Sequence, residues 1–353
     1  MTAAPVGAPA GAATAPLVAT VPVLEVRDLV VRYGSGRRGR NTPPAVDGVS
    51  FDIGPGETLG VVGESGSGKS TIGKAVLGLQ PATAGTVKLH GQDITSMSLK
   101  QRSRLVADLR VVFQDPYSSL NPARTIGQTL VEPLQLMGVK GAEAWAKACA
   151  GLESVGLPGD AADRYPAQFS GGQRQRIAIA RALVCDPKVV VLDEPVSALD
   201  LSSQAQVLNL LADLRDQRGL AFMFIAHDLG VVRFLAQRSV VLYRGQVMET
   251  GPVEAVNSQP RHPYTVALTA AAPVPRPAEQ AARRVAREAL GVGTAGAAQP
   301  AATGCPFVPR CPLATDLCTS ERPPLRLVHE TLTACHHAVR VPQLGGSAPL
   351  GHP

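Results

Sequence analysis

Short apolar runs alternate with stretches of helical spacing through the middle of this chain. Each run is short and shows little polar alternation, which is typical of a strand that is buried on both faces. The predicted strands are Thr58–Val62, Arg110–Phe113, Val189–Leu192, Leu220–Ala226 and Ser239–Tyr243. Helical stretches separate them, so the pattern favours an α/β fold with a mostly parallel, wound sheet.

The pattern differs on either side of these strands. Residues 23–53 indicate two or three short strands around a loop at 34–44. From about residue 115 to 169 the apolar spacing is helical, in Ile126–Met137 and Ala142–Val155. We therefore expect a helical subdomain at 115–169 within a larger domain that spans residues 23–272.

The remaining segments differ in composition. Residues 1–22 are rich in Ala, Pro and Gly and carry no Lys or Arg, so we expect a disordered tail without the charged start of a secretory signal. Residues 273–303 predict a flexible linker, in which Ala278–Leu290 could form a helix. A cysteine-rich module follows at 304–340, and residues 341–353 form a second tail. No apolar run approaches the roughly 20 residues that span a bilayer.

A glycine-rich sequence, GESGSGKS at 63–70, lies between a predicted strand and a predicted helix and fits G-x-x-x-x-G-K-[ST]. Its glycines let successive N–H groups meet phosphate oxygens at the positive end of the helix. Lys69 would reach the β- and γ-phosphates, Ser70 would ligate Mg²⁺, and Thr71 would lie on the α-phosphate side. The alternative is a turn that only joins a strand to a helix. The expected nucleotide-binding residues are Gly63, Ser65, Gly66, Ser67, Gly68, Lys69, Ser70 and Thr71.

Adjacent carboxylates, Asp193 and Glu194, end the apolar run 189–192. Beside a phosphate site, Asp193 could hold Mg²⁺ through water and Glu194 could polarise the attacking water as a general base. The alternative is that the pair only caps the next helix. Together with the phosphate loop, the pair predicts nucleotide hydrolysis.

The sequence FSGGQ at 169–173, ahead of VVVLDEP at 189–195, resembles the ATPase subunit of an ABC transporter. In that family Gln114 matches the glutamine loop that senses the γ-phosphate metal, and His227 matches the switch histidine that contacts the γ-phosphate. The SALD sequence that ends at Asp200 matches the loop that crosses the dimer seam, and Tyr33 matches the aromatic residue that stacks on adenine. The resemblance implies a P-loop NTPase of the ABC cassette type, with an antiparallel β edge subdomain, that binds ATP and Mg²⁺.

The resemblance also implies a site shared between two subunits. The turn at 170–173 opens a predicted helix, so its N–H groups and hydroxyl form a second anion site. In the family this site faces the nucleotide of the partner ATPase, and hydrolysis separates the two subunits. The helical subdomain would take a coupling helix from a membrane subunit, or alternatively only complete the core. The turn consists of Ser170, Gly171, Gly172 and Gln173.

Four of the six cysteines lie between residues 305 and 335, with the spacing C-x5-C-x6-C-x16-C. These spacings are looser than the close pairs of structural zinc sites, and four thiolates suit an iron–sulfur cluster. A cluster, Zn²⁺, and reduced thiols or disulfides all remain open. RHPYT at 261–265, GCPFVPRCPLATDLC at 304–318 and ACHH at 334–337 resemble the C-terminal extension of oligopeptide and dipeptide importer ATPases. That resemblance implies a [4Fe-4S] cluster, with a structural role, bound by Cys305, Cys311, Cys318 and Cys335.

The sequence VFQDPYSSLNP at 112–122 resembles the second of the two paired ATPases in these importers. The implied function is ATP hydrolysis that powers dipeptide or oligopeptide uptake, from the cytoplasmic face of the membrane. The implied partners are a paralogous ABC ATPase in a heterodimer, two transmembrane permeases and an extracytoplasmic peptide-binding protein. Close relatives move nickel chelates or other small solutes, so the cargo stays open.

Composition bears on the rival functions. The net charge is +6 over 353 residues, and the basic cluster Arg37–Arg40 lies in a Gly-rich loop without interleaved aromatic residues, so we expect no nucleic-acid partner. A soluble ABC ATPase acting on DNA or ribosomes is one alternative, but the chain has one phosphate loop and a short helical insertion. A regulatory subunit that closes without hydrolysing ATP is another. The presence of both Glu194 and His227 argues against it.

Overall fold

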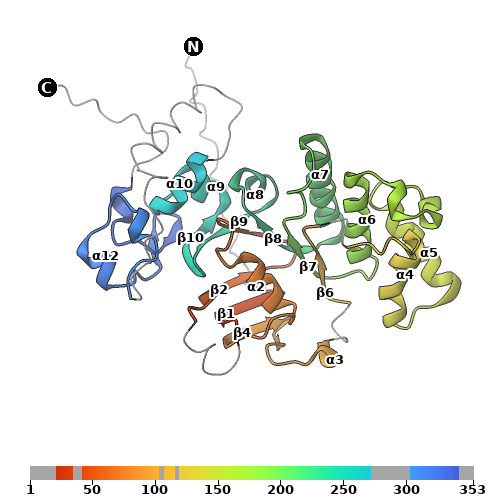
Figure 1. The fold of residues 1–353 in the computed structure, drawn as a ribbon, viewed down its shortest axis with the longest axis horizontal. Helices are drawn as coiled ribbons and strands as arrows, with labels where there is room; N and C mark the ends of the chain where they lie inside the picture. The colour runs from red at the N-terminus through yellow and green to blue at the C-terminus, as the bar shows by residue number, and fades with distance from the viewer. Residues whose placement is uncertain (1–20, 35–41, 103–106, 116–118, 272–302, 342–353) are drawn as a thin grey trace, which may run out of the picture.

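The computed structural model describes residues 21–34, 42–102, 107–115, 119–271 and 303–341 (Figure 1). The predicted tails, the linker at 273–303 with its helix, and the Arg37–Arg40 cluster fall outside these ranges, apart from their edges.

The larger sheet has the strand order β11-β12-β10-β9-β3-β8-β7-β6. Strand β3 lies between β9 and β8 and is parallel to both, and β7 lies between β8 and β6, again in parallel. Each predicted strand is present within two residues of its expected bounds. The five strands are β3 (Thr58–Val62), β6 (Leu109–Val112), β7 (Val189–Asp193), β8 (Ala221–Ala226) and β9 (Arg238–Tyr243).

A hydrophobic core lies on each face of this sheet. In β7, Val189 and Val191 pack with one core, while Val190 and Leu192 pack with the other. Both sets are essentially inaccessible to solvent. This double burial explains why the strand is an unbroken apolar run rather than an alternating one.

One core is shared with a separate antiparallel sheet of order β2-β1-β4-β5. The first two of its strands correspond to those expected within residues 23–53. The other two follow the phosphate-loop helix α2 and were not predicted, because only Val87 and Leu89 of β4 are buried and the apolar signal is weak. The elements are β1 (Leu24–Val31), β2 (Val46–Ile53), β4 (Ala84–Leu89), β5 (Gln92–Asp93) and α2 (Lys69–Val76).

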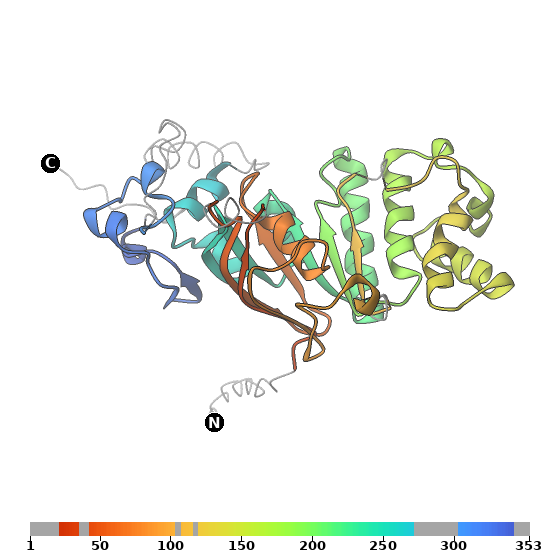
Figure 2. The ribbon, with the colours of Figure 1, turned by 60° about the horizontal axis from the view of Figure 1, so that its bottom comes forward.

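Helices supply the core on the opposite face. Both figures show the helical subdomain at one end of the molecule, beyond α6 (Figures 1 and 2). Its helices α4 and α5 match the predicted helical runs to within two residues. Besides α2, the helices in the described residues up to 271 are α3 (Leu99–Arg102), α4 (Ile126–Leu136), α5 (Gly141–Glu153), η2 (Gly159–Asp163), η3 (Pro166–Gln168), α6 (Gly171–Leu183), α7 (Leu201–Arg218), α8 (Leu229–Leu235), α9 (Val253–Ser258) and α10 (Pro263–Ala271).

The cysteine-rich residues lie at the end of the molecule opposite the helical subdomain (Figure 2). Their hairpin extends the larger sheet, since Glu249 and Thr250 of β10 pair antiparallel with Thr333 and Leu332 of β12. Backbone hydrogen bonding therefore joins this module to the sheet that holds the phosphate loop. The elements are β10 (Gln246–Pro252), η4 (Val308–Arg310), α12 (Asp316–Ser320), β11 (Arg326–Val328), β12 (Thr331–Thr333) and η5 (Ala338–Arg340).

A buried carboxylate fastens these elements together. Glu249 accepts hydrogen bonds from the backbone N–H groups of Arg261 at 2.8 Å and His262 at 3.0 Å, and from the Thr331 hydroxyl at 3.0 Å. Burial raises the pKa of Glu249, and these hydrogen bonds oppose the rise. The neighbouring His262 is also buried, and its Nδ1 accepts from the Tyr264 N–H at 3.0 Å.

Burial makes His262 a source of acid sensitivity. It lowers the pKa of His262 from 6.5 to about 3. In the unfolded chain His262 therefore binds a proton near pH 6.5, whereas in the folded chain it binds one only near pH 3. The stability contributed by neutral His262 is complete above pH 6.5 and is lost as the pH falls toward about 3.

We predict that His262→Asn flattens the fall in thermal midpoint on the acid side of pH 6.5. Asn can still accept from the N–H two residues ahead but does not titrate. Differential scanning calorimetry of both proteins over a pH series measures the effect. Glu249 is present in both proteins, so its own titration cancels in the comparison. Identical pH slopes would contradict the assignment.

Candidate nucleotide site

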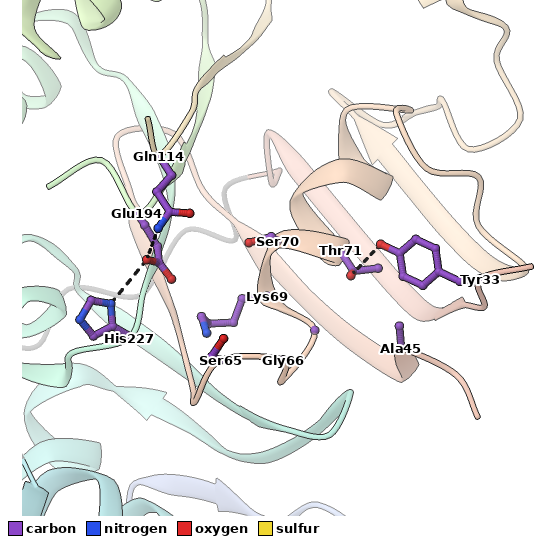
Figure 3. Close-up of a pocket in the computed structure, with 11 residues that line it drawn as sticks. Tyr33, Ala45, Ser65, Gly66, Lys69, Ser70, Thr71, Gln114, Glu194 and His227 are labelled. Carbon is purple, nitrogen blue, oxygen red and sulfur yellow. Dashed lines mark hydrogen bonds and ion pairs between the residues drawn. The ribbon is translucent and has the colours of Figure 1, made fainter. Parts of the chain in front are cut away.

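A cavity of about 490 Å³ lies where strands β3, β7 and β8 end (Figure 3). Parallel strands bring their carboxyl ends to one edge of a sheet, which is why residues far apart in sequence meet here. The volume is in the range of small-molecule sites. The lining residues are Tyr33, Ala45, Ser65, Gly66, Gly68, Lys69, Ser70, Thr71, Gln114, Glu194 and His227.

The glycines of the phosphate loop are required by its shape. Gly66 and Gly68 have φ values of +78° and +103°, which residues with a Cβ rarely adopt. A Cβ at Gly63 would collide with the carbonyl oxygen of Leu242. Ser67 is buried, and its carbonyl accepts from the Gly245 N–H at 2.8 Å. The loop is thus held in one conformation ahead of α2.

Lys69 supplies a fixed positive charge to the cavity. Its Nζ donates to the carbonyls of Gly63 at 2.7 Å and Glu64 at 2.9 Å. Burial lowers the pKa of Lys69, while the nearby carboxylates of Glu194 and Asp193 act in the opposite direction. The ammonium and the positive end of α2 together fit a phosphate group.

Ser70 and Asp193 lie together beside Lys69. The Ser70 hydroxyl donates to the Asp193 carboxylate at 2.9 Å. Burial raises the pKa of Asp193, and this hydrogen bond opposes the rise. A hydroxyl and a carboxylate in contact are the hard oxygen donors that Mg²⁺ prefers, so the residues present fit that ion.

Glu194 is the central side chain of the site. Its Oε2 lies 3.1 Å from the Gln114 amide nitrogen and 3.5 Å from Nδ1 of His227 (Figure 3). The backbone of Glu194 has φ +48°, a strained value for a residue with a side chain, and its N–H donates to the Ile225 carbonyl at 3.0 Å. Strain of this kind is typical of functional positions.

The alternative that the acidic pair caps the next helix is wrong. Asp200 takes that role, since its side chain accepts from the Ser203 N–H at 2.9 Å and caps α7. Glu194 lines the cavity, and Asp193 lies behind the lining residue Ser70, whose hydroxyl donates to it.

At the rim of the cavity, the Tyr33 hydroxyl lies 3.0 Å from that of Thr71, and the tyrosine is partly exposed. The predicted second anion site lies elsewhere. Ser170 caps α6 through a capping box with Gln173, and both residues are exposed. The structure places the turn at 170–173 and Asp200 outside the lining of this chain's cavity.

The four clustered cysteines are not disulfide-bonded. Burial raises the pKa of Cys311 to about 12 and that of Cys335 to about 11, and neighbouring thiols of the set raise both further. Four cysteine sulfurs are a donor set that suits a metal or cluster, although the raised pKa values favour the protonated thiols over the thiolates that would bind it. The arrangement does not suit one, since in the described residues no three His, Cys, Asp or Glu side chains are placed to hold a metal ion. The expected cluster geometry is thus not present in this structure.

Sequence reasoning missed several residues around the site. Ala45 lines the cavity but offers no chemistry that a pattern could reveal. Tyr264 and Arg310 contact Glu64 of the phosphate loop. Arg310 lies between Cys305 and Cys311, and Tyr264 lies in RHPYT at 261–265. Both segments resemble the family, but no local pattern predicts that they contact a loop so far away in sequence.

Comparisons with known proteins decide the family. Residues 46–197 match the family described as ABC transporter, and residues 248–318 match that described as oligopeptide/dipeptide transporter, C-terminal region. A putative peptide import ATP-binding protein of Brucella abortus (strain 2308) is 47% identical over 319 residues, covering 89% of this chain and 93% of that protein. This chain belongs to the oligopeptide/dipeptide family of ABC transporter ATPases.

Other similar proteins agree with this placement of the ABC ATPase. A putative peptide import ATP-binding protein of Brucella ovis is 46% identical over 308 residues, covering 87% of this chain and 95% of that protein. A dimeric ATP-binding cassette in a post-hydrolysis state, bound to ADP and Pi, has 29% identity and a TM-score of 0.58, covering 65% of this chain and 98% of that one. A component of an ABC transporter complex from Clostridium perfringens has 26% identity and a TM-score of 0.60, covering 67% and 91%.

The family confirms several expectations for the ABC ATPase. The predicted α/β cassette fold, ATP hydrolysis, and ATP with Mg²⁺ as ligands are all correct. Among the described residues, no helix is both long and apolar enough to cross a membrane.

Proposed function

We propose that this ATPase powers import of dipeptides or oligopeptides across the cytoplasmic membrane, together with membrane permeases and a substrate-binding protein. The observation that carries the proposal is the C-terminal region of the oligopeptide/dipeptide family at residues 248–318, in the same chain as a cavity lined by Lys69, Gln114, Glu194 and His227. Such an ATPase would lie at the cytoplasmic face as a peripheral subunit.

Each side chain of the cavity has a role in the proposed hydrolysis. Lys69 and the backbone N–H groups of the phosphate loop hold the β- and γ-phosphates. Ser70 and Asp193 would hold Mg²⁺, which would neutralise charge on the phosphates. Glu194 accepts a proton from the attacking water. In this proposal Gln114 senses the metal at the γ-phosphate, His227 contacts the γ-phosphate, and Tyr33 stacks on adenine.

The turn at 170–173 serves the partner's nucleotide in this proposal. Its Ser170 and Gln173 are exposed, the turn lies outside this chain's own cavity, and its capping box fixes its backbone without a bound anion. Asp200 sits at the start of α7, where Gly172 of the turn lies close to Ser203. We propose a heterodimer with a paralogous ABC ATPase, in which each turn completes the opposite site.

We predict that Glu194→Gln retains ATP binding but slows hydrolysis by about 10²-fold or more, because the general base is removed while Lys69 still holds phosphate. The matched control is Glu254→Gln, which alters an exposed carboxylate paired with Arg233 away from the cavity. Phosphate release by the assembled transporter measures turnover, and equilibrium titration measures binding. A Glu194→Gln complex that turns over like wild type would falsify the assignment.

We further propose that the chain consists of an ATPase domain at 23–272, a linker at 273–303 and a cysteine module at 304–340. In this proposal the cysteine module binds a [4Fe-4S] cluster. Three of the four thiols are buried and the fourth is half-buried, and their pKa values influence one another. The side chains would have to move to bring the four thiols together around a cluster. The bonds formed would stabilise a module too small to fold alone.

We predict that anaerobically purified protein is brown, with broad absorption near roughly 400 nm and iron and sulfide in the sample. Cys318→Ser should lose the iron, because it removes one of the buried thiols. Cys149→Ser, which alters a cysteine of α5, should keep it. Stoichiometric zinc without iron in wild-type protein would favour the zinc alternative and refute the cluster.

A further inference from the structure

The phosphate loop is held from outside by two residues of the C-terminal region. The Glu64 backbone N–H donates to the Tyr264 hydroxyl at 2.9 Å. The Glu64 carboxylate accepts two hydrogen bonds from the Arg310 guanidinium, at 2.8 and 3.0 Å. Tyr264 belongs to α10, and Arg310 lies in η4 between Cys305 and Cys311. One residue of GESGSGKS is thus held at both its backbone and its side chain.

Packing fixes these two residues in place. Tyr264 and Phe307 are fully buried, and their rings meet that of Tyr243 with centroids 4.7 and 5.3 Å away. The Arg310 guanidinium lies 5.5 Å from the Phe307 ring centroid and 5.8 Å from that of Tyr243. Contact with aromatic faces and a two-pronged carboxylate pair restrict the guanidinium to one geometry. Its position is therefore set by the C-terminal module and the end of β9.

The charge of Glu64 gives this contact a consequence for nucleotide binding. Glu64 lies close enough to Lys69 for the two charges to interact, and the Lys69 ammonium donates to the Glu64 carbonyl. An unpaired carboxylate here would repel the triphosphate and compete for the lysine charge. Arg310 cancels that charge with a group that stays protonated at any physiological pH.

We propose that Arg310 and Tyr264 are positioning residues that hold and neutralise Glu64, so that ATP binds tightly only when the C-terminal module is packed against the phosphate loop. The C-terminal module, which is the cysteine-rich module at 304–340, then contributes to ATP binding as well as extending the sheet. Any change that displaces η4 or α10 weakens ATP binding, because Arg310 and Tyr264 then no longer hold Glu64 of the phosphate loop. The inference requires ATP binding alone and is independent of the cargo.

The test is equilibrium binding of a fluorescent ATP analogue to the full-length chain. Arg310→Met keeps the apolar stem but leaves Glu64 unpaired, and we expect the Kd for ATP to rise about tenfold, in line with the loss of one charged hydrogen-bonded pair. ADP, which carries less charge, should be affected less. In the assembled transporter KM for ATP should rise while kcat changes little.

A second substitution that restores ATP binding distinguishes an effect of the Glu64 charge from an effect on folding. Adding Glu64→Gln to Arg310→Met removes the unpaired carboxylate, so the Kd should return toward the wild-type value. The matched control is Arg233→Met, which breaks a similar two-pronged ion pair with Glu254 on the surface and should leave the Kd unchanged. Thermal midpoints of all variants show whether each one folds.

Two results overturn the proposal: an unchanged Kd in Arg310→Met, or a double variant that binds as weakly as the single one. Should Arg310→Met fail to fold, Tyr264→Phe keeps the ring packing and removes the acceptor of the Glu64 N–H. It should weaken ATP binding, and an unchanged Kd there overturns the proposal as well. Wild-type protein that binds no ATP at all would instead refute the proposed function.

Discussion

The whole site depends on one backbone constraint: residues 63–68 must leave the end of a fully buried strand and turn tightly into α2, with left-handed backbone at Gly66 and Gly68. Strand β3 lies in the interior of the larger sheet, between β8 and β9, and is buried along its entire length. Strand β8 is parallel to β3 and β7 is parallel to β8, and all three end at the same edge, so Glu194 and His227 reach the same cavity as the loop. A strand with one exposed face could not hold a loop so rigidly, because it would lack packing on that side.

Charge balance is the second determinant of the site. Asp193, Glu194 and Glu64 all lie near Lys69 and influence its charge, so an anionic ligand enters a region that already contains carboxylates. Mg²⁺ held by Ser70 and Asp193 would offset part of that negative charge in the proposed complex. Arg310 offsets another part from the far side of the loop. None of the described residues of the C-terminal module lines the cavity, and the module contacts the site through Arg310 and Glu64.

Much of this could be predicted from the sequence because the information is local. The unbroken apolar run of β7 followed by Asp193, and the glycines that the phosphate loop requires, are patterns within a few residues. Strands β4 and β5 were missed because they are short and half-exposed. The pairing of β12 with β10 and the contact of Arg310 with Glu64, 246 residues away, depend on tertiary packing that no local period reveals. The cysteine spacing predicted a cluster of thiols, but not how those thiols are arranged.

The most direct test is a cryo-EM map of the assembled transporter in which this chain carries Glu194→Gln, prepared with ATP and Mg²⁺. We expect ATP with its β- and γ-phosphates against Lys69, Mg²⁺ at Ser70, and, on the γ-phosphate, the turn of the opposing ATPase that corresponds to residues 170–173 here. A map in which ATP contacts only this chain, or lies away from the phosphate loop, would contradict the proposed site.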